Sequence, residues 1–555
     1  MPRKLSRALI MLAVTATVAL SVFTGGCSTG GKKNMWFEHS TKKILSGYVN
    51  SAGKDSYTLY LSRNEYEGCQ IAVNPDETYD DFSFEISGPD GVVPGGGDIA
   101  EGISVELFSE SFLRAPKYYP FFQVSYDEEG KYEEYPDALA PLTGSVTVRR
   151  METTPFYVLV HARPEASAGE YEVSITAKAG DNVIGSCRLT VHVWDFTLPE
   201  TPSLSAVAGL GVYDIARVTE TKDNDELQLL YEKYYDFLAE HKISPYSLPY
   251  DVLDGRADKF MDDPRVTGFK VEYGNDDYIL AVREKLLSKP GRVEKAYFYF
   301  LDEPSTPEAY EHLVSKSRHL LELFPEARIV SPFFVDPDMY DGRDAVEYSF
   351  DSVNIWCAKL HCFDVNNPNN IYSDLQNARL ASLKDRLAER RAMGEDVWTY
   401  VCWEPGEPYL NLYVNMPGIR HRLIFWQNYL VGANGFLYWS STYWSKVSDP
   451  WSDMSTVKNL SPNVFGDGSL LYNGSKVGVF GACSSLRLEM IRDGIDDYEY
   501  FAMLENLGVS RDELLKIVSR LSPSLTEYTS DDDLLYRVRI MLGDMIEKLT
   551  ERGKL

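Results

Sequence analysis

The fold is decided by the stretch Ala296-Tyr-Phe-Tyr-Phe-Leu-Asp302-Glu303-Pro304, an apolar and mostly aromatic run that ends in two adjacent acids. Such a run, followed by turn-forming residues, is typical of a buried parallel strand rather than a helix. Acids at the C-terminal end of a buried strand lie where β/α folds carry their chemistry, and burial raises the pKa of a carboxyl group. We therefore take Asp302 and Glu303 as candidate catalytic residues. Alternatively, Asp302 caps the next helix and Glu303 is a solvated loop acid, although Ser305 or Thr306 could provide that cap.

Around this strand, residues 199–483 alternate short apolar runs with amphipathic helices. The pattern predicts strands at 204–212, 243–248, 327–334, 353–358 and 396–402 and another from Gly435, and helices at about 225–241, 277–287, 308–323, 375–393 and 419–431. Repeated β-then-α units favour a (β/α)8 barrel of the TIM type over an open sheet. A glycine-rich phosphate loop is missing from the sequence, which argues against a nucleotide-binding domain.

The regions on either side of this alternation have different patterns. Residues 35–198 contain short runs of period two between Gly, Pro and Asp turns, which predict an antiparallel β-sandwich; 112–141, rich in Tyr, Pro and acids, reads as a long loop reaching the neighbouring domain. Pro199 and Pro202 mark the domain boundary. Residues 484–555 predict helices packed on the barrel, the first at 485–507, where Arg492 and Asp496 are spaced to pair.

The N-terminus predicts export. Basic residues precede an apolar stretch from 8 to 23, so 1–26 reads as a signal peptide. Thr24-Gly-Gly-Cys27 resembles a lipobox, which predicts lipidation of Cys27, a tether at 27–34 and a place in a bacterial cell envelope, on its periplasmic or cell-surface side. Secretion is the alternative if the lipobox is not processed. No later window is apolar enough to span a membrane, so the lipid is the only membrane contact we predict.

The amino-acid composition argues against some classes of binding partner and favours others. The net charge of -28 comes without a basic tract, which argues against nucleic acid. The chain has 37 Tyr and 9 Trp, and aromatic rings are common stacking platforms for sugars. Besides Cys27 there are six cysteines without the paired C-x-x-C spacing of zinc sites, so we expect no metal, and either buried thiols or one disulfide. The candidate sugar-binding residues near strand ends are Trp356, Tyr400, Trp403, Glu404, Tyr438, Trp439 and Trp444.

Three motifs together resemble glycoside hydrolase family 123 and its close relatives. They are Phe300-Leu-Asp302-Glu303-Pro304, Gly466-Asp-Gly468 with Tyr472, and Leu486-Arg-Leu-Glu-Met-Ile-Arg-Asp-Gly-Ile-Asp-Asp-Tyr-Glu-Tyr500. The resemblance implies a retaining exo-β-N-acetylgalactosaminidase that needs no cofactor and uses the substrate's own 2-acetamido group as nucleophile, forming an oxazolinium ion. By motif position, Glu303 would be the general acid/base and Asp302 would stabilise the acetamido group.

This division of roles carries two expectations about the acids. Asp302 should stay ionised beside the developing positive charge, while Glu303 should hold a proton near neutral pH. We expect Pro304 to keep Glu303 extended and to end the strand, so that both side chains reach the barrel rim.

Two other functions remain open from the sequence. The protein could be a retaining glycosidase of different specificity, with Glu303 as acid/base and Glu404 as nucleophile. It could also be a lipid-anchored protein that binds glycans without hydrolysing them.

Overall fold

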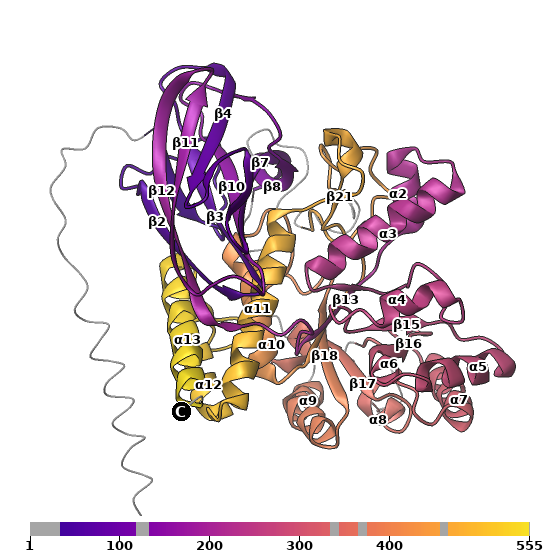
Figure 1. The fold of residues 1–555 in the computed structure, drawn as a ribbon. Coiled ribbons are helices and arrows are strands. Elements are labelled where there is room, and N and C mark those ends of the chain that lie inside the picture. Colours follow the sequence, from indigo (N-terminus) through magenta and orange to yellow (C-terminus); the bar gives the residue numbers. More distant parts are fainter. Residues whose placement is uncertain are drawn as a thin grey trace, which may run out of the picture.

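A computed structural model describes residues 34–117, 132–333, 343, 345–364, 374–455 and 464–553 (Figure 1). The predicted signal peptide, Cys27 and nearly all of the tether lie outside these ranges. Among the helices in these ranges, none combines the length and the apolar character needed to cross a membrane.

The N-terminal region forms two sheets of six strands each, drawn in indigo to purple in Figure 1. The first has the order β1 (Met35–His39), β3 (Glu65–Val73), β10 (Thr154–Ala162), β7 (Ile103–Pro116) and β6 (Gly96–Ala100), with β8 (Tyr132–Pro141) also paired to β7. The second has the order β2 (Ser56–Arg63), β12 (Asn182–Thr197), β11 (Gly169–Ala179), β4 (Tyr79–Gly88) and β5 (Gly91–Pro94), with β9 (Val146–Val148) beside β4.

The two sheets bury one common core. Leu59 and Leu61 of β2 belong to the same buried cluster as Ile71 and Val73 of β3. The strand pairs are antiparallel, as expected, except that β2 and β12 run parallel. The chain crosses from the first sheet to the second before β2 and back again after it, and this leaves β2 free to run in the direction of β12.

The segment expected to be a loop at 112–141 is largely a long β-hairpin. The arms β7 and β8 pair from Phe108↔Pro141 to Pro116↔Tyr132, with a register shift between Ser111 and Phe112; residues 118–131, between the arms, lie outside the described ranges. The prolines and acids that suggested a loop fit an edge strand, where one row of backbone N–H groups faces away from the sheet. The arms do contact the rest of the chain, because Leu113 and Tyr135 share a buried cluster with Val414.

Within the described residues, eight parallel segments follow in chain order. They are β13 (Ser205–Ala208), β14 (Ser244–Pro245), β15 (Phe269–Val271), β16 (Ala296–Phe298), residues 329–333, β17 (Ile355–Lys359), β18 (Asp396–Val401) and β19 (Gly435–Tyr438). The helices around them are α2 (Val212–Thr219), α3 (Asn224–Glu240), α4 (Asp258–Met261), α5 (Asp276–Leu287), α6 (Arg292–Lys295), α7 (Pro307–Leu323), α8 (Ala345–Ser349), α9 (Asp374–Ala392) and α10 (Gly418–Val431). The five helices that periodicity predicted are confirmed to within a residue or two.

Each of these parallel segments is hydrogen-bonded to its neighbours on either side. Parallel pairing joins β14, β13, β19, β18 and β17, and it also joins β15 to β16. Parallel bridges connect Phe298 to Ile329 and Val330 to Ile355. The backbone N–H of Lys270 in β15 donates to the carbonyl of Tyr246, just after β14, at 2.7 Å. One face of these segments supplies a small buried cluster: Val207, Tyr297, Val330, Ile355, Cys357, Trp398, Tyr400, Cys402 and Leu437.

Several strands differ from expectation, and the strands predicted at 204–212 and 243–248 end already at Ala208 and Pro245. The run predicted as one strand to the acids ends at Phe298, and β15 was not predicted at all. Helix α7 is capped by Thr306, whose side chain accepts from the N–H of Ala309 at 3.2 Å. Asp302 is therefore not the cap of the helix that follows it, which removes one non-catalytic explanation for this acid.

The C-terminal region contains β20 (Tyr472–Asn473), β21 (Ala482–Cys483), α11 (Leu486–Asn506), α12 (Arg511–Val518) and α13 (Asp532–Gly553), and Figure 1 shows α11 and α13 beside the N-terminal sheets. The Leu486–Tyr500 motif lies in α11, and most of its charged side chains are buried. Arg422 of α10 binds Glu67 of β3 at 3.0 Å and Asp497 of α11 at 2.7 Å. The motif therefore joins the N-terminal sheets to the helices. The expected pair of Arg492 with Asp496 does not form: Arg492 binds Glu489 and Asp496 binds Lys242, because these partners are buried beside them.

Candidate active site

The two acids lie just beyond β16, where the chain leaves the sheet. The hydroxyl of Tyr299 donates to Asp302 Oδ1 at 2.7 Å. Glu303 has φ of +39°, in the left-handed region, so the expectation that Pro304 keeps it extended was wrong. Successive side chains of an extended strand point to opposite faces, and a turn at Glu303 breaks that alternation. A residue other than glycine adopts this conformation at a cost of about 1–2 kcal/mol, which the surrounding contacts must offset.

Glu303 is held by two side chains from the parallel strands β17 and β18. Lys359, the last residue of β17, places Nζ 3.3 Å from Glu303 Oε1 and 3.5 Å from Glu404 Oε2. The hydroxyl of Tyr400, in β18, donates to Glu303 Oε1. Lys359 and Tyr400 are opposite each other in the β17–β18 register, so one pair of neighbouring strand positions presents an ammonium and a hydroxyl to the same carboxylate.

The charges in this site are mutually dependent. Burial raises the pKa of Asp302, and the charge of Glu303 adds to this, while the Tyr299 hydrogen bond and Lys359 oppose it. Burial disfavours the Lys359 ammonium, but Cys402, Glu303 and Glu404 outweigh burial and raise its pKa overall. Burial also raises the pKa of Tyr400, and the charge of Glu303 reinforces this, so Tyr400 remains a donor. The direction of the Asp302 shift runs against the expectation that this acid is the one kept ionised, because burial outweighs the opposing effects of Tyr299 and Lys359. The site therefore combines an acid whose pKa is raised with a lysine whose charge is favoured.

A second buried acid fixes an aromatic ring. Asp467 accepts hydrogen bonds from Trp439 Nε1 at 3.1 Å and from the Tyr438 hydroxyl at 3.0 Å. Burial raises the pKa of Asp467 to about 6, and the bonds from Trp439 and Tyr438 limit the rise. Gly468 has φ of +71°, and a Cβ there would lie 2.2 Å from the Trp439 ring, so this loop needs glycine to close against the indole. The Gly466-Asp-Gly468 motif thus positions Trp439, which is partly exposed.

The structure brings together some of the predicted sugar-binding residues and not others. Tyr400 and Glu404 are in the site, and the Trp403 ring, 41% exposed, has its centroid 6.0 Å from Lys359 Nζ. Trp356 is fully buried on the opposite face of β17, with Nε1 donating to Glu395 at 2.6 Å. Trp444 is fully buried beside Tyr234.

Alternation along the strands explains this division. Cys357 in β17 and Leu437 in β19 belong to the cluster on the face that leads to the acids, as does Tyr400. Trp356 and Tyr438 occupy the intervening positions and pack in the larger core on the other face. We therefore leave Trp356, Tyr438 and Trp444 out of the sugar-contacting surface and retain Trp403, Trp439, Tyr400 and Glu404.

Sequence reasoning missed Lys359 and gave no role to Tyr299 or Asp467. The signal for Lys359 was available, because it is a lysine at the end of the otherwise apolar run Ile355-Trp-Cys-Ala-Lys359. A cation in that position needs an anionic partner or a functional role to offset its burial. The partner could not be identified from sequence, since Glu303 and Glu404 belong to other segments.

The cysteines do not contribute ligands to a cluster. All six cysteines in the described ranges are buried, and none forms a disulfide. In the same part of the chain, no group of three or more His, Cys, Asp and Glu side chains is arranged to hold a metal ion.

Comparison with known proteins finds a sequence match to one family model and a structural match to one of its solved members. Residues 272–504 match the family model described as glycoside hydrolase 123, catalytic domain. A family 123 glycoside hydrolase from Clostridium perfringens, solved to describe glycolipid glycan hydrolysis, superposes with a TM-score of 0.61 at 14% identity, over 94% of this chain and 98% of that one. A family 39 glycoside hydrolase from Bacteroides cellulosilyticus WH2 gives a TM-score of 0.28 at 10% identity, over 74% of this chain and 80% of that one, too low to support an argument.

No curated protein matches this chain. The matched range nevertheless contains both acids, Lys359, Tyr400 and the α11 motif, and the solved relative shares the mixed α/β architecture over almost the whole length of both chains. The family supports glycosidase activity on a glycan substrate. Residues 272–504, which contain the candidate active site, are therefore similar in sequence to the catalytic domain of glycoside hydrolase family 123, and the chain shares the fold of the solved relative.

Proposed function

We propose that this protein is a retaining exo-β-N-acetylhexosaminidase, acting on terminal β-linked N-acetylgalactosamine by substrate-assisted catalysis. The observation that carries the proposal is that two adjacent acids have separate partners: Tyr299 donates to Asp302, whereas Tyr400 and Lys359 bind Glu303. Separate partners suit separate roles on one substrate.

In this mechanism Glu303 protonates the departing glycosidic oxygen as the acetamido carbonyl attacks the anomeric carbon. Asp302 accepts a hydrogen bond from the acetamido N–H and balances the positive charge of the oxazolinium ion. Glu303 then removes a proton from the water that opens this ring. Lys359 and Tyr400 would stabilise the Glu303 carboxylate formed in the first step, and Trp403 or Trp439 would pack against the sugar ring.

The test uses aryl β-glycosides with good and poor leaving groups. We expect Glu303→Gln to lose most of its kcat/KM for a 4-methylumbelliferyl substrate but little of its kcat/KM for a 2,4-dinitrophenyl substrate, whose first step needs no protonation. Asp302→Asn should lose turnover of both, because both require the acetamido attack. Turnover of β-galactosides but not β-N-acetylgalactosaminides by the folded parent protein would refute the proposal, as would unchanged kcat/KM in both variants.

A second candidate function is a double displacement in which Glu404 is the nucleophile. One ammonium contacts Glu303 at 3.3 Å and Glu404 at 3.5 Å, so these two carboxylate oxygens are less than about 7 Å apart. Retaining pairs are separated by about 5–5.5 Å. If Glu404 is the nucleophile, Glu404→Ala loses all turnover, and azide restores it as a glycosyl azide. If the reaction is substrate-assisted, Glu404→Ala keeps turnover and forms no such azide product.

We also propose a barrel and sandwich arrangement for the domains and a cellular location for the protein. The continuous links between eight parallel segments support a (β/α)8 barrel at 199–483, and the shared core of the two sheets supports a sandwich at 35–198. The helices support the boundary before 484–555. The N-terminal sequence alone supports lipidation of Cys27 and an envelope location. Metabolic labelling with a fatty acid should modify the parent but not Cys27→Ser, and equal labelling would refute this assignment. A protein that binds glycans without hydrolysing them stays the alternative if no substrate turns over.

A further inference from the structure

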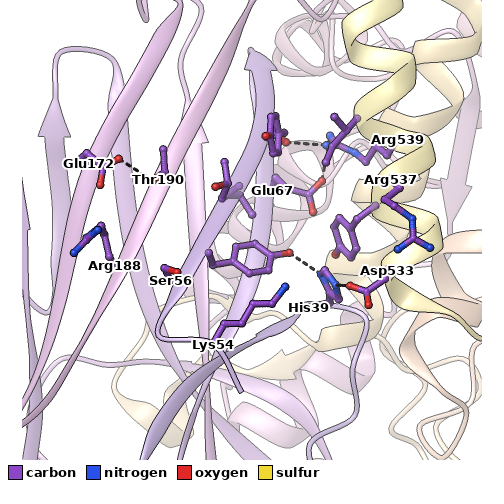
Figure 2. A pocket seen from close by; sticks show the side chains of 16 residues that line it. His39, Lys54, Ser56, Glu67, Glu172, Arg188, Thr190, Asp533, Arg537 and Arg539 are labelled. Atoms are coloured by element: carbon purple, nitrogen blue, oxygen red, sulfur yellow. Dashed lines mark hydrogen bonds and ion pairs between the residues drawn. The ribbon is translucent and has the colours of Figure 1, made fainter. Parts of the chain in front are cut away.

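A pocket of about 510 Å³ lies away from the acids, between strands β2 and β12 and the start of helix α13 (Figure 2). None of its lining residues belongs to the candidate active site. Its size is within the range of pockets that hold small ligands. Figure 2 shows Lys54 and Arg188 on either side of Ser56, with Asp533 and Arg537 of α13 across the opening.

Part of the wall is fixed by contacts within the protein. His39 binds the Tyr57 hydroxyl at 2.7 Å and Asp533 at 2.9 Å, and its ring stacks on Tyr536 at a centroid distance of 4.3 Å. Arg539 binds Glu67 at 3.1 Å, and both are almost completely buried. This side of the pocket is therefore held by contacts within the protein, and the Arg539 charge is already paired.

The opposite side has polar groups that the protein does not use. In the described part of the chain, neither Lys54 nor Arg188 makes an ion pair or a hydrogen bond through its exposed side chain, and the same is true of the hydroxyls of Ser56 and Thr58. In the parallel register Arg188 is opposite Ser56 and Thr190 is opposite Thr58. Residues two apart on paired strands share one face of the sheet, so a guanidinium and several hydroxyls are presented together.

Acids near this face are already engaged. Glu172 accepts a hydrogen bond from Thr190 at 2.8 Å, and Asp533 is bound to His39. Lys54 still attracts Asp533, whose pKa is lowered chiefly by the His39 hydrogen bond and further by Lys54. Two cations without a direct ion pair in the described residues therefore face one pocket in a chain whose net charge is -28, where long-range charge alone would repel anions. Hydroxyl groups beside cations, with the Tyr60 ring also in the lining, match a ligand that carries both an anionic group and hydroxyls.

We propose that this pocket is a second saccharide-binding site, which takes a sugar bearing a sulfate or carboxylate group. Lys54 and Arg188 would bind the anionic group, and Ser56 and Thr58 would bind ring hydroxyls. A site so placed could hold a charged part of a glycan while the acid pair acts elsewhere.

The experiment measures binding to the full-length protein by calorimetry, using N-acetylgalactosamine 6-sulfate, glucuronic acid, N-acetylgalactosamine and inorganic sulfate as probes. We expect one of the two charged sugars to bind, more weakly at higher salt. Lys54→Gln/Arg188→Gln should weaken this binding at least tenfold. The matched control is Lys548→Gln/Arg552→Gln, which removes two charges from α13 outside the pocket.

Each outcome decides the proposal. Loss of binding in the pocket variant alone supports it. Equal binding by both double variants, no binding of either charged sugar, or inorganic sulfate binding as tightly as the sugars would overturn it. Glycosidase activity on an uncharged aryl substrate should be the same in the pocket variant and the parent. Because binding is measured without turnover, failure of this proposal does not depend on the proposed reaction, and failure of the reaction leaves this test intact.

Discussion

Replacing Lys359 with methionine tests whether the buried ammonium supports the proposed acid. The side chain of Lys359 is 4% exposed, while those of Glu303 and Glu404 are 32% and 46% exposed. At 3.3 and 3.5 Å, each pair would be worth about 5 kcal/mol at an effective dielectric constant of about 20. Solvent at the two half-open carboxylates screens much of this, and about 1–3 kcal/mol in total is a reasonable net value.

The methionine variant lacks the ammonium that would stabilise Glu303 during proton transfer. As Glu303 donates its proton, negative charge develops next to Lys359, so the interaction is stronger in the transition state than in the substrate complex. At about 1.4 kcal/mol per tenfold change, we expect kcat/KM to fall roughly 5- to 150-fold for a 4-methylumbelliferyl β-N-acetylgalactosaminide. The fall should be several times smaller for the 2,4-dinitrophenyl analogue, whose leaving group needs little protonation.

Two controls separate this role from damage to the fold. Lys359→Arg keeps the charge and should recover part of the activity, and thermal unfolding should show that Lys359→Met is folded at the assay temperature. Equal losses with both leaving groups would indicate a purely structural role for Lys359. Unchanged kcat/KM in the folded methionine variant would refute the electrostatic argument altogether.

Further predictions concern stability. Both carboxylate oxygens of buried Glu110 have no hydrogen-bond partner in the described residues, and burial raises its pKa to about 8. The folded state therefore holds this proton more tightly than the unfolded chain, so stability from this group is present below about pH 4.5 and is lost as the pH rises towards 8. We expect Glu110→Gln to gain about 4 kcal/mol relative to the parent between pH 4.5 and 8, measured by urea unfolding across this range; parallel pH profiles would contradict it. Arg422→Met removes a buried cation that binds Glu67, Asp493 and Asp497 and should cost about 3–5 kcal/mol, although Arg539 still binds Glu67 and Asp497. The exposed pair Arg283–Glu326 gives the control, since Arg283→Met should cost about 1 kcal/mol or less. Similar losses in the two variants would contradict the expectation that the buried cation contributes more than the exposed one.

Much of the architecture could be predicted from the local pattern. Helices such as α3, α7 and α11 have apolar periodicity together with good N-terminal caps, and both signals are local, so their bounds agree with the structure. The acid pair could be located for a similar reason, because an apolar run that ends abruptly in charge marks a strand end. By contrast, β15 has only three residues, too few to establish a period, and its pairing with β16 comes entirely from the fold.

The sequence by itself determined that Asp302 and Glu303 follow a buried strand, and that the 486–500 motif is helical. It could not determine which aromatic residues face the site. Interior parallel strands are apolar on both faces, so the sequence does not show which of the alternating side chains point toward the site. Only the tertiary structure decided that Tyr400 faces Glu303 while Trp356 faces a helix-covered core. It also decided that Lys359 lies between Glu303 and Glu404, since contact between charges on separate strands depends on register and on the turn at Glu303.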